Sequence, residues 1–516
     1  MNGRTWREKR RGGGDSSDLA GLLAAAGLTG LTGPGPAADP TRGRGKAEPV
    51  AGRRARPPMA VPPRRGHPVA FGGRAPRRHP GASVWRATTG QLAGLNPWVM
   101  GAPPPPVGVY VGYDARTGSA FSCHLVEWLH RGLVTNPNAL VTGLPGSGKS
   151  SHLKIVFGWR LIPFGVRVFI PGDIKGEYPQ LCRALGVDPV ALGPGLPGRV
   201  NPLDPGPLGA NLPAGGKELT ERLAEIHRRR LALLGNMAEI RLRRRLTPFE
   251  EQIVSEALRQ ATGEAAGASR LGTPTIPAVH AHLRDPDPHS VREHRVESVE
   301  ELRRVSRDVT AALGGMIAGV LGGLFDTATT IRPDWAAPIV SLDVSRLESR
   351  GDDVIAAALS CLSTWGQAAI DDPARPVTVV IRDELWRWMA LPGMARKIDS
   401  DLRLSRAQGT IQVLATHRTS DFEAVGDAGS EEVAIARGLV ASCQTRLLLA
   451  QDLGPLRAIR EEIGLSEAEV DLVSGWGAAE LGRALWKVGS YGSYDVQLAL
   501  TPTEMAITAT NERMRV

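Results

Sequence analysis

Residues 143–150 read Gly-Leu-Pro-Gly-Ser-Gly-Lys-Ser, a complete G-x-x-x-x-G-K-[ST] motif of the kind that binds phosphate groups. The glycines allow the backbone to curl so that successive N–H groups point at one anion, and the N-terminal end of the next helix adds positive charge. Lys149 is placed to reach the outer phosphates, and the Ser150 hydroxyl is placed to ligate their Mg²⁺. The motif predicts a nucleotide site formed by Gly143, Leu144, Pro145, Gly146, Ser147, Gly148, Lys149, Ser150 and Ser151.

The residues around this motif have the pattern that a phosphate loop needs. Asn138-Ala-Leu-Val-Thr142 reads as a short buried strand before the loop, and Ser151 to Trp159 reads as the helix after it. A chance match would give only an isolated turn, whereas strand, loop and helix in this order are the expected context. The flanking residues therefore favour nucleotide binding.

A second apolar strand, Val377 to Ile381, is followed by Arg382, Asp383 and Glu384. Asp383 is suited to hold the magnesium shell, commonly through water, and Glu384 to accept a proton from an attacking water. The alternative is an acidic N-cap of the next helix, because carboxylates are favoured there. With the phosphate motif upstream, hydrolysis is the favoured interpretation. The glutamate also separates this chain from small-molecule kinases, which need no water-activating glutamate beside the metal aspartate.

The strand Ile411 to Ala415 ends in Thr416 and His417, where P-loop motors place a polar residue that senses the γ-phosphate. His417 is a candidate to hydrogen-bond that phosphate or to orient the water, and a structural histidine at a strand end is the rival interpretation. Three arginines are candidates to clamp the transferring phosphoryl group of a neighbouring subunit. Most arginines are solvated, so we expect at most one of them to act in this way: Arg403, Arg406 or Arg446.

Short apolar runs and helical stretches alternate along the chain, which predicts an α/β fold with a mainly parallel sheet and ligands at the carboxyl ends of its strands. From about residue 210 to 320 the pattern is helical throughout, which predicts a helical insertion. Thr247-Pro-Phe-Glu250 is a capping box that marks a helix start. The expected strands are residues 138–142, 166–170, 338–343, 377–381, 411–415 and 445–449.

The composition, with 42% hydrophobic residues among 516, predicts a large core and two or three structural units. The four cysteines are isolated, which fits reduced thiols in a cytosol and does not indicate zinc. No apolar run of membrane-spanning length and no signal-type segment occurs, so we expect neither export nor a membrane span.

The net charge of +9 is unevenly distributed. Residues 1–82 hold 16 Lys and Arg against 5 Asp and Glu, which leaves 46 against 48 for residues 83–516. This Arg-, Gly- and Pro-rich segment predicts a disordered basic arm, either docking on DNA, acidic lipid or an acidic partner, or merely solubilising. Residues 83–136 then form a small lead-in with one or two hairpins, and residues 137–516 the ATPase domain.

Two weaker signals fall in the helical insertion. His280, His282, His289 and His294 have no regular helical spacing, which favours an exposed loop over a metal site. The basic runs Arg228 to Arg230 and Arg241 to Arg245 are candidates to touch nucleic acid, but a solvated helix face is the favoured interpretation.

Taken in order, the motifs resemble those of the ATPases of type IV secretion and conjugation systems, the TraC-like branch of the HerA and FtsK group of P-loop motors. The similarity spans roughly residues 107–516. The matching pieces, besides the helical insertion, are Asn138 to Ser151, Asp173 to Tyr178 with Asn201 to Asp204, Gly323 to Asp326, Asp383 to Trp386, and Leu414 to Asp421.

This resemblance implies a RecA-like, ATP- and Mg²⁺-dependent motor that is hexameric when active and powers transfer or pilus assembly from the inner face of the cell membrane, in the cytoplasm and bound through channel proteins. It implies that Lys149, Ser150, Asp383 and Glu384 keep the roles argued above. Three departures stand out. Members usually carry a large N-terminal domain that contacts the channel, whereas here we expect only the arm and the short lead-in. Many members carry glutamine where His417 stands, and Arg382 replaces a usually apolar residue, so we expect an internal cation beside the acid pair.

Three functions follow as hypotheses. The first is ATP hydrolysis that energises a conjugative or type IV secretion channel, moving DNA or protein. The second is a DNA translocase or coupling protein of the FtsK type, for which DNA is a partner. The third is a non-enzymatic, ATP-binding assembly scaffold. DNA-stimulated turnover would favour the second, and unchanged turnover in Glu384→Gln would favour the third.

Overall fold

The structure is a computed structural model that describes residues 66–68, 74–76, 105, 107–210, 212–263, 272–294, 296–320, 322–331, 333–370, 375–389, 394–417, 431–476 and 481–509. The chain divides into two units, Met1–Pro57 and Pro58–Val516, and every described residue belongs to the second. Most of the predicted arm, and residues 83–104 of the lead-in, lie outside the described residues. Within residues 1–82 the structure describes one antiparallel pair, β1 (Gly66–Pro68) and β2 (Arg74–Pro76), which the composition did not predict.

A mixed sheet, eleven-stranded within the described residues, forms the centre of the second unit, in the order β4-β3-β13-β12-β11-β5-β10-β9-β6-β8-β7. The part from β11 to β7 is parallel. Its strands are β5 (Ala139–Thr142), β6 (Arg167–Asp173), β7 (Val190–Ala191), β8 (Ile339–Asp343), β9 (Thr378–Arg382), β10 (Thr410–Thr416) and β11 (Thr445–Leu448).

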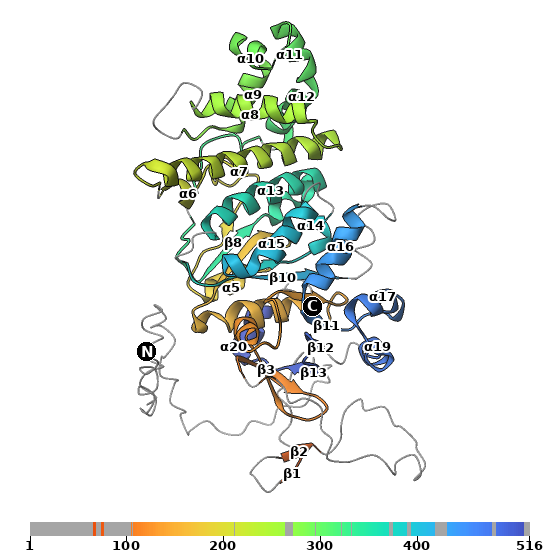
Figure 1. The fold of residues 1–516 in the computed structure, drawn as a ribbon. Helices are drawn as coiled ribbons and strands as arrows, with labels where there is room; N and C mark the ends of the chain where they lie inside the picture. The colour runs from red at the N-terminus through yellow and green to blue at the C-terminus, as the bar shows by residue number, and fades with distance from the viewer. Residues whose placement is uncertain are drawn as a thin grey trace, which may run out of the picture. The chain divides into compact units, whose positions relative to one another are not determined.

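These strands are apolar on both faces because helices cover both sides of the sheet (Figure 1). In β10 the side chains of Ile411 and Val413 pack into one core, whereas Leu414 packs into the other. The core that contains Leu414 includes α13 (Asp352–Ile370), α15 (Met394–Gln408) and α16 (Glu431–Ser442). The core that contains Ile411 and Val413 includes α3 (Leu125–His130), α5 (Pro179–Ala184), α20 (Pro502–Thr508) and the π-helix η1 (His152–Trp159) that continues α4 (Lys149–Ser151).

The antiparallel part of the sheet contains one hairpin of the kind predicted for the lead-in, and a second, C-terminal hairpin that was not predicted. A C-terminal hairpin of β12 (Arg483–Val488) and β13 (Gly492–Leu498) pairs with β11 on one side. On the other side β13 pairs with β3 (Val109–Asp114), which forms a hairpin with β4 (Ala120–Cys123). The described lead-in is therefore an edge of the central sheet and not a separate layer.

Between β7 and β8 the chain is helical, from α6 (Pro207–Ala210) to the π-helix η4 (Met316–Val320). The predicted capping box is present, since Thr247 accepts from the Glu250 N–H and Glu250 accepts from the Thr247 N–H. The longest helix, α7, packs along α13 and so ties this insertion to the sheet domain (Figure 1). The main helices of the insertion are α7 (Gly216–Leu242), α8 (Pro248–Thr262), α9 (Ile276–Arg284), α10 (Pro288–Glu293), α11 (Val299–Val305) and α12 (Arg307–Gly315).

The remaining elements are short. They are η2 (Ile162–Phe164), η5 (Ser345–Arg350), α14 (Leu385–Met389), α17 (Leu453–Ala458), α18 (Arg460–Ile463) and α19 (Glu467–Ser474). All four cysteines are free and buried. Across the described part of the chain, none of the helices has the length and apolar character that a membrane span requires.

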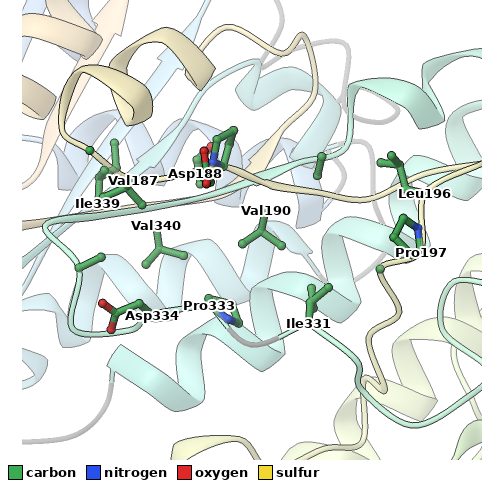
Figure 2. Close-up of a pocket in the computed structure, with 16 residues that line it drawn as sticks. Val187, Asp188, Val190, Leu196, Pro197, Ile331, Pro333, Asp334, Ile339 and Val340 are labelled. Carbon is green, nitrogen blue, oxygen red and sulfur yellow. The ribbon is translucent and has the colours of Figure 1, made fainter.

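A pocket of about 530 Å³ lies at the far edge of the sheet, beside β7 and the first half of β8 (Figure 2). Its walls are mainly aliphatic side chains and prolines, and Asp188 and Asp334 supply its two carboxylates. We call it the sheet-edge pocket.

Candidate functional site

The phosphate motif forms a tight loop between β5 and α4. Gly146 and Gly148 have φ values of 78° and 106°, in the left-handed region that glycine tolerates best. A Cβ at Gly143 would lie 2.7 Å from the Leu449 Cβ, and one at Gly148 would lie 2.9 Å from the backbone of Gly482. The glycines are thus required by backbone conformation and by close packing. Pro145 and Gly146 at the tip of the loop are exposed.

Lys149 is buried under this loop. Its Nζ donates to the Gly143 carbonyl at 2.8 Å and lies 2.7 Å from His417 Nδ1. Burial lowers the Lys149 pKa, and the charges of Asp383 and Glu384 oppose that shift. The ammonium group is therefore held at the base of the loop by one carbonyl and one imidazole.

Asp383 and Glu384 follow the carboxyl end of β9, two strands from β5. Asp383 accepts from the Glu384 N–H at 2.9 Å and from the Tyr178 hydroxyl at 3.3 Å. Burial, with the nearby charges of Glu177 and Glu384, raises the Asp383 pKa to about 6. Among the hydrogen bonds of the described residues, neither carboxylate accepts from a backbone N–H inside α14, so the N-cap alternative has no support.

The Glu384 carboxylate is surrounded by donors. It lies 2.6 Å from Lys175 Nζ and 2.8 Å from His417 Nε2, and it accepts from the Trp386 indole at 2.7 Å. Burial alone would raise the Glu384 pKa, but these hydrogen bonds outweigh it and lower the pKa to about 2. Glu384 also has φ 54°, a conformation that costs a non-glycine residue energy and that is concentrated at functional sites.

His417 connects the two halves of the site. Its Nδ1 accepts from Lys149 and its Nε2 donates to Glu384, an assignment that follows from the hydrogen-bond network. The structure thus brings the phosphate loop and the acid pair together at the carboxyl ends of the neighbouring parallel strands β5, β10 and β9, a place that we call the crevice. This placement is where open α/β sheets bind ligands.

The crevice also holds residues that sequence reasoning gave no role. Lys154 on η1 is fully buried, with its Nζ 3.5 Å from Glu177 Oε2 and 5.9 Å from the centre of the Tyr178 ring. Asp173, whose pKa burial raises to about 7, accepts from the N–H groups of Glu177 and Tyr178 and so shapes this turn. The segment Asp173 to Tyr178 follows β6 at the same edge of the sheet. Its position after an apolar strand was the signal that could have identified it.

The three candidate arginines lie away from the crevice of their own chain. Arg406 donates to the carbonyl of Thr135, which precedes β5. Arg406 therefore lies at the amino ends of the strands, opposite the phosphate loop. Arg403, on the same helix, is exposed and pairs with Asp399. Arg446 donates to the carbonyls of Ile463 and Val440. Action on a neighbouring subunit stays a prediction for all three.

Arg382 is an internal cation, but it does not face the acid pair. Its buried guanidinium donates to Asp401 at 2.6 Å and to Gln412. The sequence prediction placed this charge beside Asp383 and Glu384. In the structure Arg382 pairs instead with Asp401 on α15, which covers one face of β9.

The residues of the crevice fit Mg²⁺ bound with a nucleotide. The described residues contain no cluster of three His, Cys, Asp or Glu side chains for a metal. Such a cluster is not needed, because Mg²⁺ at phosphate sites is held by one or two protein oxygens with phosphate and water. Ser150 and Asp383 supply those oxygen types, and the tip of the loop at Pro145 and Gly146 is exposed.

No protein-family model matches the sequence, and no curated protein matches it. Among solved structures the fold is similar to that of VirB4 of Thermoanaerobacter pseudethanolicus, with a TM-score of 0.60 and 23% identity over 79% of this chain and all of that chain. The plasmid coupling protein TrwB with an ATP analogue gives a TM-score of 0.48 and 15% identity, covering 78% of this chain and 91% of that one. The similarity to VirB4 confirms the predicted fold class, a RecA-like α/β fold with a mainly parallel sheet.

The insertion corrects one prediction. His280 and His282 lie on α9 and His289 lies on α10, so these histidines are not in a loop. Short helices with prolines at their first positions interrupt the periodicity, which is why the sequence pattern looked irregular.

Proposed function

We propose that this chain is a Mg²⁺-dependent ATPase that energises a conjugative or type IV secretion channel for DNA or protein. The single observation that carries the ATPase assignment is the chain of contacts from Lys149 through His417 to Glu384. The channel assignment is supported by the fold shared with VirB4 over the whole of that chain.

The residues divide the chemistry as follows. The loop amides and Lys149 bind and orient the triphosphate, and Ser150 and Asp383 hold Mg²⁺. When bound, Mg²⁺ neutralises charge on the phosphates. Glu384 accepts a proton from the attacking water, and His417 holds that carboxylate against the cation at the phosphates. Preorganised charges of this kind stabilise the transition state without reorganisation.

We propose that the active form is a homo-oligomer, a hexamer as the resemblance implies, in which Arg403, Arg406 or Arg446 reaches the neighbouring site. Channel proteins at the inner face of the membrane would be the partners, with the chain in the cytoplasm and attached through them.

The test is ATP turnover by the purified chain with and without DNA, and with and without membranes that contain the channel components. Turnover raised by channel components and indifferent to DNA supports the proposal. DNA-stimulated turnover would instead favour a DNA translocase, and no turnover would favour a scaffold. Lys149→Ala is the site control and Lys217→Ala, an exposed lysine of α7, is its matched control. Equal turnover in both variants would contradict the site assignment.

A further inference from the structure

The helical insertion contains an open pocket of about 460 Å³ that the proposed ATP chemistry does not use. It lies between α9, α11 and α12, and we call it the arginine pocket. The residues that matter for its chemistry are His280, Arg284, Arg303, Arg307, Gly314 and Gly315. The lining contains three arginines and no carboxylate.

Most of this positive charge has no internal counter-ion. Among the described residues, no carboxylate lies within salt-bridge distance of Arg284 or Arg307, and both side chains belong to exposed residues. Arg303 is the exception, because it pairs with Asp285 at 2.5 Å and with Glu300 at 3.9 Å. The pocket therefore presents at least two guanidinium groups that are free to bind an external anion.

Two consecutive glycines of α12 line the pocket. A Cβ at Gly314 would lie 2.7 Å from His280 Nε2, and one at Gly315 would lie 3.3 Å from an Nη atom of Arg241. The glycines thus let the imidazole and a further guanidinium, from the end of α7, approach α12 closely. Burial and the charge of Arg284 lower the His280 pKa, so the ring contributes hydrogen bonds and the arginines contribute the charge.

We propose that the arginine pocket binds the phosphate groups of a nucleic acid strand. The guanidinium fork matches phosphate oxygens in a bidentate geometry, and arginine is less strongly hydrated than lysine, so it is the preferred side chain for such contacts. Arginines from three helices, α9, α11 and α12, line one open depression, and a nucleic acid backbone that crosses the surface would meet them together. The sheet-edge pocket has similar size but carries Asp188 and Asp334, so volume alone does not make a phosphate site (Figure 2).

Binding at this pocket needs neither nucleotide nor turnover, so the test separates it from the proposed ATPase. The native cysteines are all buried, which allows one exposed cysteine, introduced as Ala311→Cys in the pocket lining, to carry an environment-sensitive dye. The full chain labelled in this way is titrated with a single-stranded oligonucleotide without ATP. We expect a saturable dye response.

The arginines are then tested in the same labelled background. We expect Arg284→Glu with Arg307→Glu to weaken binding about 10-fold or more at about 0.1 M salt, and to lower the salt slope by about 2, because two phosphate contacts are lost. Arg304→Glu is the matched control. Arg304 is an exposed residue of α11 that pairs with Glu301 and does not line the pocket, so this variant should bind as the parent does. The milder double variant Arg284→Gln with Arg307→Gln should weaken binding in the same direction. Thermal unfolding of each variant shows whether it is folded.

Several outcomes would overturn the proposal. One is oligonucleotide binding, seen by anisotropy, without a dye response, which would place binding elsewhere, for instance on the basic residues 1–82. A second is equal weakening by Arg304→Glu, which would indicate a general charge effect. A third is a dye response to phosphatidylglycerol vesicles or to inorganic phosphate but not to the oligonucleotide, which would make this a lipid or small-anion site.

Discussion

The nucleotide crevice and the arginine pocket both gather positive charge, but they treat it differently. In the crevice Lys149 and Lys175 are held by His417 and Glu384, so its cations already have partners inside the protein. In the arginine pocket Arg284 and Arg307 have none among the described residues. A site with internal partners is preorganised and must exchange those contacts when a ligand binds. A site without them depends on an external anion to neutralise its charge.

This difference has a consequence for salt dependence. Partly buried charges are weakly screened by ions, whereas exposed charges are strongly screened at physiological ionic strength. We therefore expect nucleotide affinity to change little with salt and binding at the arginine pocket to fall steeply with it.

The largest effect is expected from Lys149→Ala. The buried ammonium sits between the loop and His417, so its loss removes a preorganised charge from the phosphates and frees the imidazole. We expect turnover to fall about 10³-fold, in the range found when one such electrostatic contact is deleted. A coupled ATPase assay measures this, with Lys217→Ala as the control. A fall of less than 10-fold would mean that the crevice does not bind the reacting phosphates.

The buried charge of Arg382 should affect the stability of the fold and not the rate of ATP hydrolysis. Arg382→Met leaves Asp401 buried with Lys397 as its remaining partner, at 3.1 Å. We expect a loss of about 3 kcal/mol in the free energy of unfolding, the lower end for breaking a buried pair. Urea unfolding measures it, and Arg382→Met with Asp401→Leu should recover part of the loss because no charge is then stranded. A double variant less stable than the single one would contradict this account.

Glu384→Gln separates catalysis from binding within the crevice. The amide keeps the hydrogen bond from Trp386 but cannot accept a proton, so we expect turnover to fall about 10²-fold while affinity for a fluorescent ATP analogue is retained. Glu251→Gln, an exposed acid on α8, is the matched control. Unchanged turnover in Glu384→Gln, with oligomers still forming, would favour the scaffold hypothesis.

Much of this architecture could be predicted from local sequence. The phosphate motif specifies its own loop, and the parallel strands other than β7 are the short apolar runs expected from the sequence. The meeting of residues 143–151 with Asp383 and Glu384 followed from one rule, that the carboxyl ends of parallel strands share an edge. The confirmed α/β fold rests on these local patterns.

A hairpin in the lead-in was expected, but the joining of the antiparallel strands to the central sheet was missed because that pairing is non-local. β3 and β13 meet across almost the whole described chain, at Asp114 and Val496, and no short-range signal encodes that register. The partners of Arg382 were missed for a similar reason. The sequence placed a cation next to two acids, but alternate residues of a strand face opposite sides of the sheet, and Arg382 points to Asp401 instead.

The roles of Lys175 and Tyr178 were also beyond the sequence. Both follow β6, whose place beside β9 is set by the strand order and not by proximity along the chain. The contact of Lys175 with Glu384 further depends on the unusual backbone of Glu384, with φ 54°. A positive φ can be expected from the sequence at a glycine but not at a glutamate.

The smallest predicted effect contrasts a pair of the insertion that is exposed on its arginine side with the fully buried pair of Arg382 and Asp401. Hydrogen bonds from Arg244 at 2.8 Å lower the Glu250 pKa from its ordinary 4.5 to about 2. A carboxyl whose pKa is depressed by folding stabilises the protein above its unfolded pKa, and that stabilisation is lost as the pH falls through the folded value. Wild type should therefore exceed Arg244→Ala in stability at pH 7, and the difference should shrink between pH 4.5 and 2. Urea midpoints at pH 7 and near the lower limit measure it. Because Arg244 is exposed, the whole difference should be smaller than that of Arg382→Met, and an equal or larger one would show that burial is not what sets the strength of these pairs.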